Sequence, residues 1–179
     1  MSISTKRGDD GLTDLLFGER VTKNHPVPVA CGDVDELNAA LGMARAWTTE
    51  KAVDEALDAV QRQLIALMGE LATPPEELER YREAGFAVVG AADVERLTNA
   101  VGALETELGS SFNDWAIPGA STTPCGAAFD FARTVCRRAE RSVVPLHPLN
   151  GHIVPFLNRL SDWLWLMARR ESRQASRGA

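Results

Sequence analysis

The sequence is poor in the residues that build disulfide frameworks and metal sites. Its 179 residues include three cysteines and three histidines. The cysteines, Cys31, Cys125 and Cys136, are odd in number and show no CxxC spacing. That pattern argues against a disulfide framework or a zinc ribbon, and it is typical of a reducing cytoplasm. The histidines lack metal-ligand spacing, so we predict no metal site built by the protein.

Other signals are missing as well. No apolar run approaches the length of a transmembrane helix, and the first residues, MSISTKRGDDG, contain no apolar segment typical of a secretory signal. A P-loop motif, GxxxxGK[ST], is absent. The formal net charge of −6 argues against nonspecific binding of nucleic acid. We expect a cytoplasmic, single-domain protein with no membrane or nucleic-acid partner.

Helical periodicity dominates what is present, and no segment alternates convincingly as a strand. Asp33 and Glu36 are spaced as an N-terminal cap and its reciprocal partner before the first apolar stripe. These features predict an all-α fold, a five-helix antiparallel bundle over residues 31–172. Glycine and proline predict an irregular arm over 1–30, and 173–179 is expected to be a disordered tail. The five apolar stripes cover residues 34–44, 53–71, 94–108, 128–143 and 153–167.

The fourth stripe overlaps FARTVCRRAERSVV, a segment that concentrates positive charge on an acidic protein. At about 100° per residue, Arg133, Arg137 and Glu140 share one face. Arg141 flanks this face, and Arg138 points elsewhere. Like charges at i,i+4 cost about 0.2–0.5 kcal/mol each on an exposed helix. The row is either a solvated face with Arg–Glu pairs or a site for a polyphosphate, which guanidinium groups bind bidentately.

Three other features have both an ordinary and a functional interpretation. The glycine-rich arm TKRGDDGLT, followed by Lys23, could bind phosphate through backbone N–H groups or be a flexible N-terminus. Asp35 and Asn158 lie beside apolar stripes, where polar residues usually form a solvated face. Asp35 could also pair with an arginine of the fourth helix if the two helices face each other. Trp115, before the turn at Pro118, is typical of a hydrophobic anchor.

Together these segments resemble the PduO-type ATP:cob(I)alamin adenosyltransferases over roughly residues 5–170. Three motifs carry the resemblance: TKRGDDGLT (5–13) with Lys23, GDVDELNAALG (32–42), and FARTVCRRAERSVVPL (131–146) together with FLNRLSDWLW (156–165). The last pair of helices is highly specific for the family, whereas the arm alone is not.

The resemblance implies a concrete function. Such enzymes are helical bundles that assemble as homotrimers, with each active site between neighbouring subunits. They transfer the 5′-deoxyadenosyl group of ATP, supplied with Mg²⁺, to the Co(I) of reduced cobalamin and release triphosphate. The adenosylcobalamin formed could then be handed to an enzyme that depends on it.

The resemblance also implies roles for individual residues. Arg133 would pair with Asp35 and order the site, and these two residues with Arg137 and Glu140 make up the catalytic set. Trp115 falls where the family usually has phenylalanine, on the face that displaces the lower axial ligand of the corrinoid. The implied nucleotide ligands are Thr5, Lys6, Gly8, Thr13 and Lys23 from one subunit, and Arg137, Arg138, Glu140, Arg141 and Asn158 from the next.

The sequence departs from the family pattern at a few positions, and a second function remains open. Arg7 replaces a usual threonine, Val29 and Cys31 replace commonly acidic and aromatic residues, and Ala120 and Ser142 replace a common glycine and arginine. The alternative function is a noncatalytic corrinoid carrier. The intact arginine row favours the enzyme, because a carrier has no need of a triphosphate site. A plain helical assembly protein would leave that row unexplained.

Overall fold

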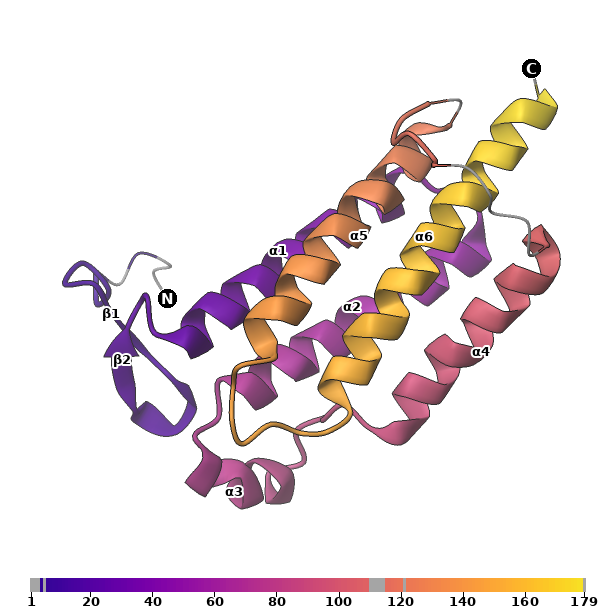
Figure 1. The fold of residues 1–179 in the computed structure, drawn as a ribbon. Coiled ribbons are helices and arrows are strands. Elements are labelled where there is room, and N and C mark those ends of the chain that lie inside the picture. Colours follow the sequence, from indigo (N-terminus) through magenta and orange to yellow (C-terminus); the bar gives the residue numbers. More distant parts are fainter. Residues whose placement is uncertain (1–3, 5, 110–114, 121, 179) are drawn as a thin grey trace.

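The protein is a mostly helical bundle with a small β-hairpin at one end (Figure 1). The computed structural model describes residues 4, 6–109, 115–120 and 122–178. The predicted all-α bundle is confirmed in its main features, but the described residues form six α-helices and one two-stranded sheet rather than five helices alone. The helices are α1 (Pro26–Trp47), α2 (Lys51–Leu71), α3 (Leu78–Glu83), α4 (Ala91–Leu108), α5 (Pro124–Val143) and α6 (Ile153–Gly178).

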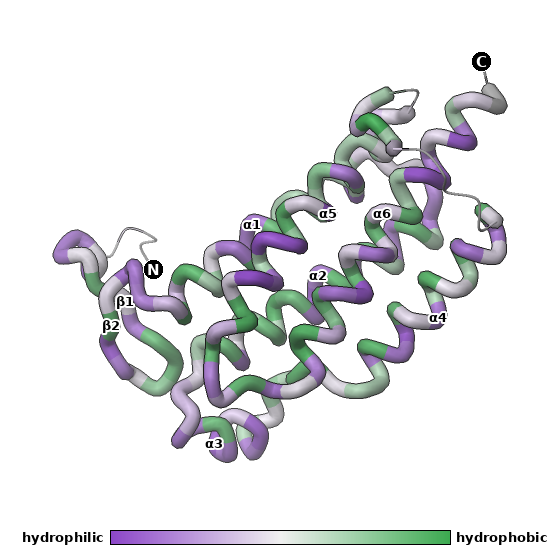
Figure 2. The backbone as a smooth tube through the Cα atoms, viewed as in Figure 1, coloured by the Kyte–Doolittle hydropathy of each residue, from purple (hydrophilic) through white to green (hydrophobic). Residues whose placement is uncertain are grey.

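The five long helices pack side by side through their apolar stripes. Helix α5 lies between α1 and α6, α2 packs on α1, and α4 packs on α6. Hydrophobic and hydrophilic residues alternate along each long helix (Figure 2). The buried side chains Leu37, Phe129 and Phe156 contribute to one continuous core. Burying such stripes stabilises these helices more than intrinsic propensity does.

Helices α1 and α5 run antiparallel, and two contacts give their register. The Cys125 thiol, at the start of α5, donates to the carbonyl of Ala44 near the end of α1 at 3.4 Å. Arg138 Nε, near the end of α5, donates to Asp33 Oδ1 near the start of α1 at 3.1 Å. The segment before α5 therefore lies at the opposite end of the bundle from the start of α1 (Figure 1).

Helix α1 begins earlier than predicted, so the expected cap at Asp33 is wrong. The helix starts at Pro26, and the His25 side chain accepts a hydrogen bond from Val27 N. Proline is tolerated in the first turn because the N–H groups there have no intrahelical partner. Asp33 lies in the second turn, where its carboxylate bonds to residues of α5.

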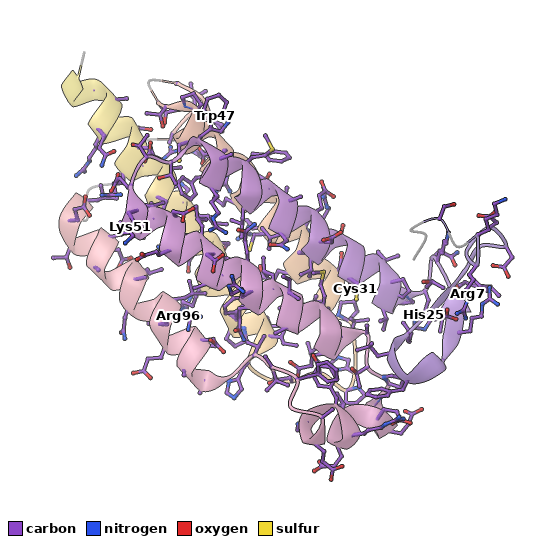
Figure 3. The ribbon with its side chains drawn as sticks, turned by 180° about the vertical axis from the view of Figure 1, so that it is seen from behind. Arg7, His25, Cys31, Trp47, Lys51 and Arg96 are labelled. Atoms are coloured by element: carbon purple, nitrogen blue, oxygen red, sulfur yellow. The ribbon has the colours of Figure 1, made fainter. Side chains whose placement is uncertain are left out.

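The arm contains regular structure that the sequence did not predict. Strands β1 (Leu12–Asp14) and β2 (Arg20–Thr22) form an antiparallel hairpin, with a 3₁₀ turn at Leu16–Gly18 between them. Three-residue strands are too short to show alternation, which is why the pattern missed them. Arg7 pairs with Asp14 at 2.9 Å within the hairpin region. Arg7 and His25 lie at this end of the molecule, and Trp47 lies at the other (Figure 3).

The C-terminal segment also differs from its prediction. Helix α6 continues to Gly178, so most of the expected disordered tail is helical. Arg170 anchors the late turns of α6, with Nη2 2.7 Å from Glu50 and Nε 3.2 Å from Glu107. Among the described residues, no helix combines the length and apolar character needed to cross a membrane.

Candidate functional site

Helix α5 presents two arginines that have no carboxylate partner among the residues that the structure describes. The helix is capped by Thr123, whose hydroxyl accepts a hydrogen bond from Gly126 N at 3.0 Å. Arg137 and Arg141, one turn apart, are exposed, and neither forms an ion pair in the described part of the chain. Because like charges one turn apart repel, this arrangement suits a surface that receives an anion.

Glu140 and Asn158 meet beside these arginines. The Asn158 Nδ2 on α6 donates to Glu140 Oε1 on α5 at 3.5 Å, and the Asn158 Oδ1 accepts from Arg159 Nη1 at 2.9 Å. The contact joins two residues that lie 18 positions apart in the sequence. Helices α5 and α6 thus bring Glu140 and Asn158 into contact, and Arg137 and Arg141 lie close to Glu140 along α5.

Arg138 has different neighbours. Its guanidinium forms ion pairs with Asp33 and Glu36 on α1, and the Ser142 hydroxyl donates to the same Asp33. The hydrogen bond to Glu36 and the neighbouring carboxylates raise the pKa of Arg138 above its ordinary value. These contacts clamp α5 onto α1, so the geometry gives no support to the prediction that Arg138 holds ATP.

Arg133 is paired within its own helix. Its Nε lies 3.5 Å from Asp130 Oδ1, and Asp130 is only 3% exposed. Asp35 is exposed on α1, and the described residues offer it no ion pair within the chain. The predicted Arg133–Asp35 pair is therefore wrong within one chain, because α1 turns Asp33 rather than Asp35 toward α5. The i,i+3 spacing of Asp130 and Arg133 was the signal that could have revealed the true partner.

The arm residues form a separate group at the hairpin end. Thr5 lies outside the described residues. Lys6 is exposed with a φ of 59°, and Thr13 belongs to β1. A Cβ added to Gly8 would lie 2.9 Å from Lys23 Nζ, so the Lys23 ammonium group lies close to the backbone at this glycine. No described contact joins this group to Arg137 or Arg141 of the same chain.

Trp115 is placed at the opposite end of the bundle. Its side chain is 99% exposed, and Ile117 beside it is 73% exposed. Exposed apolar side chains this close together are available to bind a ligand or partner. The ring therefore does not act as the buried anchor that was one interpretation of the sequence.

The remaining reactive groups have structural roles. Burial raises the pKa of the Cys31 thiol to about 11 and that of the Cys125 thiol to about 12, and it also raises the pKa of Cys136. All three cysteines are free thiols. In the described part of the chain, no group of three His, Cys, Asp or Glu residues is arranged to hold a metal ion.

Comparison with known proteins identifies the family. A family model described as cobalamin adenosyltransferase matches residues 3–171. The chain belongs to the cobalamin adenosyltransferase family. The corrinoid adenosyltransferase of Mycobacterium leprae is 35% identical, over 93% of this chain and 89% of the relative. Human corrinoid adenosyltransferase MMAB is also 35% identical, over 93% of this chain and 67% of the relative.

Some relatives in this adenosyltransferase family are longer. The corrinoid adenosyltransferase PduO of Salmonella typhimurium is 34% identical over 98% of this chain, which spans only 51% of that relative. A solved variant of the PduO-type ATP:corrinoid adenosyltransferase from Lactobacillus reuteri, complexed with cobalamin and ATP, superposes with a TM-score of 0.84. It is 29% identical and matches 98% of this chain and 96% of that chain.

Proposed function

We propose that this protein transfers the 5′-deoxyadenosyl group of ATP to the Co(I) of reduced cobalamin and releases triphosphate. The observation that carries the proposal is the exposed pair Arg137 and Arg141, without ion-pair partners among the described residues, beside the Glu140–Asn158 contact. The solved Lactobacillus reuteri relative, complexed with cobalamin and ATP, supports the same two ligands here.

The chemistry explains why the row is cationic. The Co(I) centre of the substrate supplies the electron pair that forms the bond to C5′, and the C5′–O bond breaks with its electrons leaving on triphosphate. Guanidinium groups aimed at that oxygen stabilise charge that grows in the transition state more than they stabilise bound ATP. Mg²⁺ would accompany ATP through the phosphate oxygens, since the described residues contain no metal cluster.

The optical spectrum of the corrinoid tests the function directly. Protein, ATP, Mg²⁺ and chemically reduced cobalamin should together give the absorbance spectrum of adenosylcobalamin, and omission of ATP should abolish it. A noncatalytic carrier would bind the corrinoid without converting it, and that result would refute the proposal.

We further propose a homotrimer with each site between neighbouring subunits. The arm that carries Lys6, Gly8 and Lys23 makes no described contact with Arg137 of its own chain, so a neighbour would complete the site. Exposed apolar side chains on adjacent helices, Met43 on α1 and Phe131 on α5, would be buried by such assembly. The free thiols fit a reducing cytoplasm, and the product would pass to an enzyme that uses adenosylcobalamin.

Asp35 provides a test of this assembly. Its exposed carboxylate would pair with Arg133 of a neighbouring subunit, so Asp35→Asn should weaken subunit affinity by at least about tenfold and lower the rate of adenosylation. Sedimentation equilibrium and the optical assay measure the two effects. Glu95→Gln, an exposed carboxylate change on α4, should leave both unchanged. An intact trimer with an unchanged rate in Asp35→Asn would contradict the proposed pair.

Trp115 is expected to assist reduction of the corrinoid. An exposed ring that occupies the lower axial face would displace the electron-donating ligand there and make Co(II) easier to reduce. Trp115→Ala should therefore slow adenosylation that starts from cob(II)alamin more than adenosylation from pre-reduced cob(I)alamin. Trp115→Phe, the usual family residue, should retain both rates. Equal losses from the two starting states would count against the axial role.

A further inference from the structure

A hollow of about 250 Å³ lies between residues 116–120, which follow Trp115, and the late turns of α6. One wall is apolar and belongs to the loop that follows Trp115, and the other wall is cationic and belongs to α6. The hollow is lined by Ala116, Ile117, Ala120, Arg169, Ser172 and Arg173.

The two arginines of the hollow differ in how they are held. Arg169 is fixed, since its side chain is 12% exposed, its guanidinium pairs with buried Asp130, and it lies 5.6 Å from the centre of the Trp165 ring. Its Nε is buried and has no hydrogen-bond partner among the described residues. Arg173 is exposed and forms no ion pair in the described part of the chain. The hollow therefore contains one preorganised donor group and one positive charge that is not neutralised.

We propose that this hollow binds the phosphodiester of the nucleotide tail that cobalamin carries on its lower face. The proposal rests on the proposed function. If Trp115 occupies the lower axial position, the tail must leave the cobalt and lie beside the corrin. Residues 116–120 follow Trp115 directly, so the hollow borders the path of the displaced tail.

The chemistry of the lining matches that tail. A phosphodiester carries one negative charge, and guanidinium groups bind phosphate oxygens with two parallel hydrogen bonds. The side chains of Ala116 and Ile117 form an apolar wall against which the sugar and base of the tail can pack. A corrinoid that lacks the nucleotide tail, cobinamide, has no group for this site.

Equilibrium binding measures the contribution of the hollow separately from turnover. Arg173→Glu reverses the charge that is not neutralised, so it should weaken binding of cob(II)alamin by about tenfold. Binding of cob(II)inamide should not change, and Arg173→Lys should retain most of the affinity for cob(II)alamin. Arg62→Glu, a charge reversal on the exposed face of α2, is the matched control for the effect of net charge.

The outcomes separate this proposal from the proposed function. A loss of affinity restricted to cob(II)alamin supports the tail site. Equal weakening of both corrinoids in Arg173→Glu, or no weakening of either, would overturn the tail site. Neither result would affect the proposed function, which the adenosyl-transfer assay of the wild-type protein tests. A wild-type protein that binds corrinoids without converting them refutes the proposed function alone, and one that binds neither corrinoid refutes both.

Discussion

Replacing Arg137 with alanine should lower kcat/KM for adenosyl transfer by about 100- to 1,000-fold, which corresponds to roughly 2.7–4 kcal/mol of transition-state stabilisation. The guanidinium is exposed and has no ion pair among the described residues, so the free protein loses little when it is removed. The transition state would lose a donor aimed at the leaving triphosphate, and in the proposed cleft between subunits charge interactions would be stronger than in water.

Steady-state kinetics with varied ATP measure this effect, and unfolding by urea checks that the fold is intact. Arg62→Ala removes another exposed arginine, which lies on α2 and pairs with Asp58, and it should leave kcat/KM unchanged. A rate within about threefold of wild type in Arg137→Ala would remove this residue from the mechanism.

The largest expected loss of stability comes from Asp130→Ala, at roughly 3–5 kcal/mol. Asp130 is 3% exposed and pairs with Arg169 on α6 and with Arg133 on its own helix. Removal of the carboxylate leaves the guanidinium of Arg169, whose side chain is 12% exposed, without its counter-charge. Breaking such a pair costs far more than the intact pair contributes, because the remaining charge is largely removed from the solvent that would stabilise it.

The free energy of unfolding, measured in urea, tests this prediction. Asp162→Ala provides the control, since Asp162 pairs with Arg159 at 3.1 Å on the exposed surface of α6. Its loss should cost at most about 1 kcal/mol. A similar small loss in Asp130→Ala would show that the buried pair does not stabilise the fold.

Much of the bundle could be predicted from the sequence because apolar spacing is a local signal. The stripe that includes Leu37 and Leu41 is buried in α1, and the stripe that includes Val135 and Ala139 is buried in α5. The start of α1 could not be placed from the sequence, because Pro26 and Pro28 are as typical of an irregular segment as of the first turn of a helix. The last turns of α6 carry few apolar residues, and ion pairs with distant residues such as Glu50 hold them in place.

The candidate site, like the fold, could be predicted from the sequence only in part. Helical spacing was enough to put Arg137 and Glu140 on one face and to turn Arg138 away. Spacing within α5 gives no information about which residue of α1 faces it, so it cannot show that Asp33, and not Asp35, bonds to α5. Asp130 was missed because a lone carboxylate in an apolar stripe gives no hint that an arginine of α6, Arg169, lies across from it.

The burial of the native cysteine thiols affects how the protein can be labelled. At mildly alkaline pH the thiols of Cys31 and Cys125 stay protonated, since burial raises their pKa to about 11 and about 12. Maleimide dyes react with thiolates, so a single cysteine introduced on the surface would be labelled well before either of them. Fluorescent reporters can thus be attached close to the exposed Trp115 without first replacing the native cysteines.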